Sequence, residues 1–257
     1  MFDLHRFLLL AHVHWAERGR SYLWFLGIGI VVHACVWLLI TQGGFKPGDY
    51  VNDFQYFVFF AGLTLTALLF AGLEFSPLGR REAALTWLMR PATALEKFLL
   101  AFLIVAVLYP LAYTLAFQVC NLPGGWLAQV VAQANPSRTI NPDQYKLYFP
   151  FADASNRPME LTWLLITNAL QALVIAGGLR FRNLAWLKTL VALFLLLAIA
   201  LPLLLMFADA DIGMLFPAGE VPPEATSFRA LRWLLWIGVP GLFWASAYFF
   251  LRDRELH

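Results

Sequence analysis

Charged residues are scarce in this chain and are missing altogether from long parts of it. Asp, Glu, Lys and Arg make up 13% of the 257 residues, whereas about 25% is usual in soluble domains. Six stretches contain none of the four: 21–41, 54–73, 98–118, 161–179, 189–208 and 233–251. Each is long enough to cross a hydrocarbon layer of about 30 Å as a helix. The sequence therefore predicts an all-α polytopic membrane protein with six transmembrane helices, forming one transmembrane domain over residues 1–257.

Several chemical signatures are also missing. The two cysteines, Cys35 and Cys120, fall in or beside predicted spans and have no spacing typical of a disulfide framework or a metal site. No Gly-x-x-x-x-Gly-Lys-Ser/Thr loop is present, so this chain is not expected to bind ATP itself. No basic run suited to nucleic acid occurs.

The predicted spans offer little for catalysis or ion coupling. His33 is the one ionisable side chain in them besides Cys35 and tyrosines, and no Glu pair, His-Glu-x-x-His or Gly-x-Ser-x-Gly motif accompanies it. We expect His33 to bond to a neighbouring helix, with a functional role as the alternative. His12 and His14 should point to different sides of a helix, which disfavours a metal site.

The basic residues predict the orientation. With both termini in the cytoplasm, twelve of the 18 Lys and Arg residues lie on that side and six on the other, which agrees with the positive-inside rule. The expected location is the cell inner membrane. Residues 1–20 have an apolar stripe through Leu4, Leu8 and Trp15, which predicts an interfacial helix before the first span.

Two loops stand out. Residues 118–160 contain turn signals at Pro123-Gly124-Gly125 and predict a cap on the outer side, with Tyr148 at the membrane interface. Residues 74–97 gather charges between two charge-free spans and predict a cytoplasmic elbow containing a short helix. Thr93 and Glu96 form a capping-box pattern at the start of the next helix.

The segment Leu88-Met-Arg90-Pro-Ala-Thr93-Ala-Leu-Glu96-Lys-Phe98 resembles the Leu-Met-Leu-Pro-Ala-Ser, Leu-Glu-Lys signature of permease subunits of bacterial type-2 ATP-binding cassette (ABC) exporters. The similarity extends weakly to the C-terminal run 248–255. The chain departs from the signature at Arg90, where the family has an apolar residue, and at Thr93, where it often has Ser.

The resemblance implies a transport subunit and not an enzyme. It implies a second permease chain, expected as a homodimer, and two copies of a separate ATPase subunit that bind ATP and Mg. The elbow would be the coupling helix that contacts this ATPase. The residues expected to make the contact are Leu78, Arg80, Arg81, Glu82, Trp87, Leu88, Arg90 and Glu96.

The cargo stays open at this point. Charge-free, aromatic-rich spans suit a lipid-like or amphipathic molecule, and a peptide or an antibiotic is the alternative. The long outer loop could contact the cargo or an accessory protein. The rival functions are an ion-coupled secondary carrier and, less favoured, a polytopic intramembrane enzyme.

Overall fold

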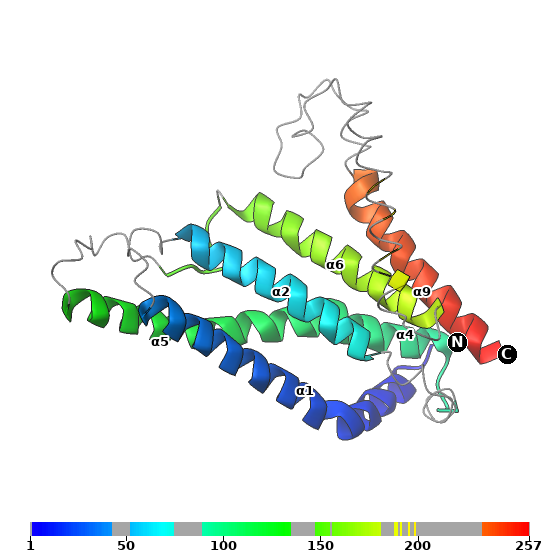
Figure 1. Ribbon diagram of the computed structural model, residues 1–257. Helices are drawn as coiled ribbons and strands as arrows, with labels where there is room; N and C mark the ends of the chain where they lie inside the picture. Colours follow the sequence, from blue (N-terminus) through cyan, green and yellow to red (C-terminus); the bar gives the residue numbers. More distant parts are fainter. Residues whose placement is uncertain are drawn as a thin grey trace, which may run out of the picture.

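The computed structural model describes residues 2–42, 52–74, 89–134, 147–154, 156–180, 188–189, 191, 195, 198 and 233–256. Within these residues the fold is helical and contains no strand, which confirms the all-α prediction. The long helices run back and forth between two ends of a bundle (Figure 1). Both chain termini lie at one of these ends, called the N/C end below.

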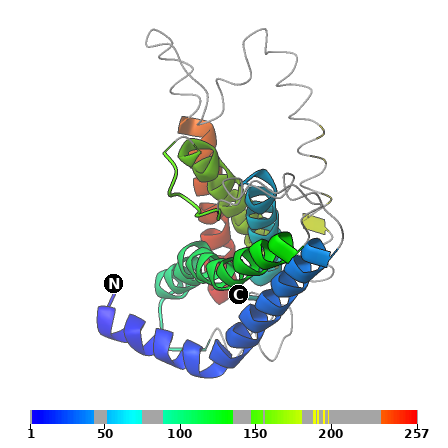
Figure 2. The same ribbon diagram turned by 90° about the vertical axis from the view of Figure 1, so that its left-hand side faces the viewer.

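Helix α1 (Leu4–Gln42) joins two predicted elements into one. We expected an interfacial helix over residues 1–20 followed by a separate span, but the helix continues through both and changes direction along its length (Figure 2). No proline interrupts it. Gly19 accommodates the indole of Trp15, because a Cβ at Gly19 would lie 3.0 Å from Trp15 Cε2. The apolar stripe of the first turns stays on the surface, where Leu4, Leu8 and Trp15 are exposed.

Helices α2 (Asn52–Glu74) and α6 (Arg157–Arg180) form the centre of the described bundle. Helix α6 packs most extensively on α9 (Val239–Leu256) and on α2, whereas α1 packs mainly on α5 (Tyr109–Ala134). Phe59, Leu63 and Ile175 are almost completely buried between these helices. Most apolar side chains of α1, by contrast, are exposed on the surface of the bundle, as expected of a helix that faces lipid.

The third predicted span is much longer than expected. Helix α4 (Ala94–Phe102), η3 (Leu103–Leu108) and α5 follow one another without a break and end at Ala134, so the first part of the predicted loop 118–160 is helical. Pro123-Gly124-Gly125 is not a turn. Gly125 instead allows close packing, because a Cβ there would lie 2.4 Å from Leu147 Cδ2.

The prolines of two predicted spans coincide with π-helical segments. Elements η3 and η6 (Leu234–Gly238) each end two residues before a proline, Pro110 and Pro240. A proline in a helix has no N–H to donate and its ring clashes with the carbonyl four residues back. Widening the helix to the i→i−5 register relieves this clash, and the N–H of Tyr109 accordingly donates to the Ile104 carbonyl.

The wider register leaves one carbonyl without a donor from its own helix. In that register residue 110 would donate to the Val105 carbonyl, but Pro110 cannot. The side chain of Gln171 on α6 donates to this carbonyl instead, over 3.0 Å. Gln171 is 1% exposed and Val105 is completely buried, so this bond satisfies a backbone group that water cannot reach.

Four of the described helices are long and apolar enough to cross a membrane: Leu4–Val36, Gln55–Glu74, Ala94–Trp126 and Arg157–Leu179. They coincide with or overlap the first four predicted spans. The predicted span 189–208 lies outside the described residues apart from four positions. Residues 233–251 are helical as predicted, but the 18 residues of α9 include the charged run from Arg252 to Glu255, and α9 is not one of the four.

The end opposite the termini is held together by a buried carboxylate. Glu160 is completely buried and accepts hydrogen bonds from the Tyr148 hydroxyl and the Phe151 amide, both at 2.6 Å. Phe151 has a φ of 63°, in the left-handed region. Tyr148, expected at the interface, is buried. Burial, followed by its bond to Glu160, raises the pKa of this tyrosine, which therefore remains a hydrogen-bond donor.

We predict that Gln171→Leu lowers the stability of the purified protein by about 1 kcal/mol, the usual size of an interhelical hydrogen bond in membranes. The reason is that the Val105 carbonyl loses its donor. Thermal unfolding in detergent would measure the change, and Ser246→Ala, which removes an exposed hydroxyl bonded within its own helix, serves as the control.

Combining Gln171→Leu with Pro110→Ala tests whether the Gln171 side chain replaces the donor that Pro110 lacks. Alanine at 110 restores an N–H to the helix, so Gln171→Leu should cost less in the Pro110→Ala background than in the wild type. Equal costs in the two backgrounds would contradict the pairing described above.

Candidate functional site

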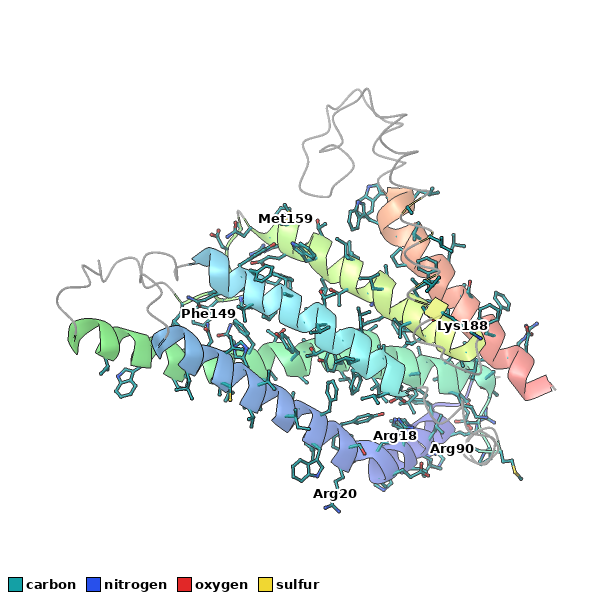
Figure 3. All side chains as sticks on the ribbon, viewed as in Figure 1. Arg18, Arg20, Arg90, Phe149, Met159 and Lys188 are labelled. Carbon is teal, nitrogen blue, oxygen red and sulfur yellow. The ribbon has the colours of Figure 1, made fainter. Side chains whose placement is uncertain are left out.

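At the N/C end, α1, the end of α2 and the start of α4 meet around several charged side chains. Arg18, Arg20, Arg90 and Lys188 all lie toward this end, whereas Phe149 and Met159 lie toward the other (Figure 3). Helix α1 contributes Arg6, His14 and Arg18, α2 contributes Glu74, and α4 contributes Glu96.

Glu96 is the centre of the first of two networks. Thr93 caps α4, and its hydroxyl accepts from the Glu96 amide while the Glu96 carboxylate accepts from the Thr93 amide, so the predicted capping box is confirmed. The same carboxylate accepts from the Arg6 guanidinium at 2.6 and 2.8 Å and from the Asp3 amide at 3.0 Å. Because Glu96 is completely buried, these four donors replace water around its charge.

Glu74 is the centre of the second network. The Tyr22 hydroxyl donates to Glu74 Oε2 over 2.5 Å, and His14 Nε2 lies 2.5 Å from the Tyr22 oxygen and 3.3 Å from Glu74 Oε1. With the hydroxyl hydrogen directed at Glu74, the His14 tautomer that carries its hydrogen on Nε2 matches this geometry. Arg18 lies 3.6 Å from Glu74 Oε2 and also donates to the Leu73 carbonyl. His14 and Glu74 are both buried.

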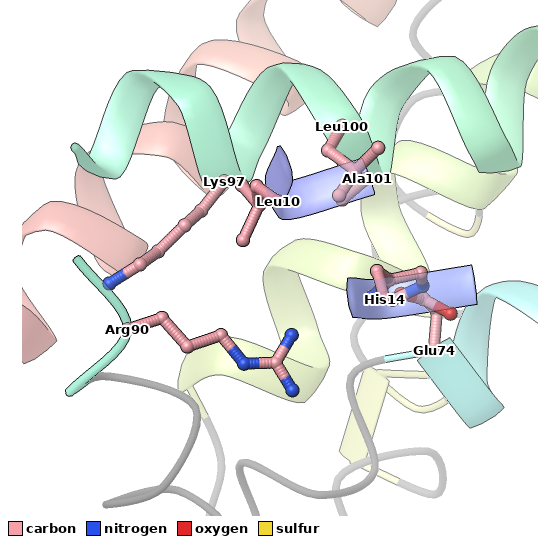
Figure 4. A pocket seen from close by; sticks show the side chains of 7 residues that line it. All are labelled: Leu10, His14, Glu74, Arg90, Lys97, Leu100 and Ala101. Atoms are coloured by element: carbon pink, nitrogen blue, oxygen red, sulfur yellow. The ribbon is translucent and has the colours of Figure 1, made fainter. Parts of the chain in front are cut away.

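Arg90 connects the elbow to α1. Its guanidinium forms an ion pair with Glu17 on α1. A cavity of about 10 Å³, room for about one water molecule, lies beside it and is lined by Arg90, Lys97, His14 and Glu74 together with Leu10, Leu100 and Ala101. In Figure 4 the Arg90 side chain extends toward the side on which His14 and Glu74 lie, whereas Lys97 extends the other way.

A much larger cavity, of about 370 Å³, lies between α1 and the helix formed by α4, η3 and α5. Apart from His14 and the hydroxyl-bearing Tyr22 and Tyr109, its walls are apolar. The remaining lining residues are Ala11, Trp15, Leu23, Phe25, Leu26, Phe70, Leu100, Ile104, Leu108 and Ala112. His14 and Leu100 line both cavities, so the polar site and the apolar cavity adjoin.

The structure describes three of the residues singled out from the elbow sequence. Arg90 pairs with α1, and Thr93 and Glu96 cap α4. Glu96 faces α1 and is completely buried, so it connects the elbow to the bundle, and its expected contact with the ATPase stays a prediction. Leu78, Arg80, Arg81, Glu82, Trp87 and Leu88 lie outside the described residues.

The sequence reading missed the Glu74 network, although a signal for it exists. His14, Arg18 and Tyr22 are spaced four residues apart and therefore share one face of a helix. The prediction that His12 and His14 point differently is confirmed, since His12 is exposed and His14 buried. His33 packs against the ring of Phe117, with centroids 4.8 Å apart. Among the described residues, no group of three or more His, Cys, Asp or Glu side chains could hold a metal ion.

Comparison with known proteins identifies no relative. No protein-family model, no curated protein and no solved structure matches this chain.

We predict that Glu96→Ala lowers the stability of the protein by about 2 kcal/mol, in the range for hydrogen bonds to a charged group. The substitution removes the acceptor for Arg6, Thr93 and Asp3. Glu17→Ala removes a carboxylate that is half exposed and should cost less than about 1 kcal/mol. Thermal unfolding of the two variants in detergent tests the difference, and equal losses would show that the Glu96 network does not hold the elbow.

Proposed function

We propose that this chain is the permease subunit of a type-2 ABC exporter. The observation that carries the proposal is the attachment of the elbow to the bundle. Residues 90–93 lead directly into α4, and this part of the chain is bonded to α1 through Arg90 and through Glu96 in the first turn of α4. Force applied to the elbow would therefore reach two membrane helices through ion pairs and a capped helix start, as coupling through a rigid element requires.

The sequence gives a second argument for the same function. The chain has no phosphate-binding loop of its own, so the ATPase, with its ATP and Mg, is a separate subunit in this proposal. Two ATPase subunits would sit beneath a homodimer of the permease, on the cytoplasmic face of the inner membrane. The N/C end, where Arg18, Arg20 and Arg90 gather, is then the cytoplasmic end.

In this proposal some residues of the elbow contact the ATPase and others attach the elbow to α1. Arg80, Arg81 and Glu82 make polar contacts with the ATPase, and Leu78, Trp87 and Leu88 anchor the coupling helix by packing. Arg90 and Glu96 hold the elbow against α1. The cargo is a hydrophobic or amphipathic molecule: a lipid, a peptide or an antibiotic.

One observation favours a second candidate, an ion-coupled secondary carrier. The buried His14 and Glu74 form a cluster with the partly buried Tyr22, of the kind that proton-coupled carriers use. Carriers place such groups near the middle of the membrane. This cluster lies instead at the last residue of α2, which is why we prefer the exporter. An intramembrane enzyme has no such supporting observation.

The proposal predicts that an ATPase with phosphate-binding motifs co-purifies with the full chain from mildly solubilised membranes, and that the complex hydrolyses ATP. Arg81→Glu/Trp87→Ala should lower recovery of this ATPase about ten-fold or more, because hot-spot residues contribute roughly 2 kcal/mol or more each to an interface. Quantitative mass spectrometry and ATP turnover are the measurements.

A matched double variant at the other end provides the control. Arg157→Glu/Trp126→Ala changes an exposed arginine and an exposed tryptophan and should leave ATPase recovery unchanged. A chain that purifies without an ATPase, and that instead moves protons in liposomes until Glu74→Gln is introduced, would establish the carrier and reject the exporter.

A further inference from the structure

The 370 Å³ cavity beside α1 is a candidate ligand site. Its volume lies within the range of about 300 to 1,000 Å³ typical of small-molecule pockets. Its lining residues come from two places on α1, residues 11–15 and 22–26, from Phe70 on α2, and from residues 100–112 of the facing helix. Both walls are thus parts of helices long and apolar enough to span a membrane.

The cavity has an apolar interior and one polar end. Phe25, Phe70 and Tyr109 close one side as a packed aromatic group, with ring centroids 4.5 to 6.1 Å apart. Of the three polar lining residues, His14 and Tyr22 lie together beside Glu74, whereas Tyr109 belongs to the aromatic group. This lining favours a ligand whose interior part is apolar and whose polar group lies at the His14 end.

The lining also shows where a ligand would enter. Trp15, Leu23 and Leu108 line the cavity and are each more than half exposed. These side chains border the outward-facing sides of α1 and η3, which belong to helices long and apolar enough to cross a membrane and would there meet lipid. The hydrocarbon available at that surface is the chain of a membrane phospholipid.

We infer that this cavity binds one acyl chain of a membrane phospholipid, which enters sideways between α1 and η3. The acyl chain lies against Phe25, Leu26 and Ile104, and the glycerol and headgroup of the phospholipid remain at the His14 end. The inference goes beyond the exporter proposal and does not depend on it, because it requires only the cavity and its place in a membrane.

Photolabelling tests the site directly. The probe is phosphatidylcholine with a diazirine on one acyl chain, added to the full-length protein in mild detergent, followed by irradiation and peptide mapping. Labels should concentrate on residues 22–26 and 104–112, and excess unlabelled phosphatidylcholine should remove them. Even labelling of the outward faces of α1, α2, α5 and α6 would overturn the proposal.

Filling the cavity provides the decisive variant. Ala112→Phe should lower labelling of the two lining segments about ten-fold, because the new ring displaces about two buried methylene groups of the ligand. Leu115→Phe adds bulk to an exposed position of α5 outside the cavity and should label as the wild type does.

A second variant reaches the cavity from the opposite wall. Leu23→Trp on α1 narrows the mouth at an exposed position and tests the site even if Ala112→Phe proves unstable. It should give the same loss of labelling, and an unchanged elution volume in size-exclusion chromatography would show that the variant is folded. Wild-type labelling in a folded Ala112→Phe or Leu23→Trp protein would place the lipid elsewhere.

Discussion

Polar groups that cannot reach water must find partners within the protein, and this requirement accounts for much of the structure. Pro110 removes a donor from a membrane helix, the helix widens into η3, and Gln171 from α6 supplies the missing donor to Val105. Glu160 and Glu96 meet the same requirement at the two ends of the bundle. Gln171 and Glu96 join segments far apart in the sequence, whereas Glu160 closes the shorter segment from Tyr148 to the start of α6.

The two networks at the N/C end each fix a different helix end against α1. Glu74 fixes the end of α2 against α1, and Glu96 fixes the start of α4 against the first turn of α1. Helix α1 thus contacts the described residues on both sides of the segment 75–88. A single long helix can do this because its direction changes along its length (Figure 2).

Local patterns in the sequence predicted the features that depend on neighbouring residues. Thr93 and Glu96 lie three residues apart, and their capping box was predictable because both partners belong to one turn. The apolar stretches predicted the long helices for a similar reason: crossing hydrocarbon requires uncharged residues over a fixed length. The direct placement of Arg90 against Glu17 needed the fold, since 73 residues separate them.

Features that depend on distant contacts were not predictable in this way. Pro123-Gly124-Gly125 indicated a turn, yet Gly125 serves close packing against Leu147, a contact that no local pattern reveals. The spacing of His14, Arg18 and Tyr22 marked a polar helix face, but only the fold brings Glu74 to it. Residues 4–20 and the first span similarly form one helix, and no proline interrupts it.

The pairing of Arg6 with Glu96 also bears on the order in which the chain can assemble. Tyr22 and Glu74 are 52 residues apart, so their contact becomes available once α2 has been synthesised. Arg6 must wait for a partner 90 residues away, at the start of the third membrane helix. The start of α1 therefore gains its partner later than Tyr22 does, and α1 can dock from its middle toward its beginning.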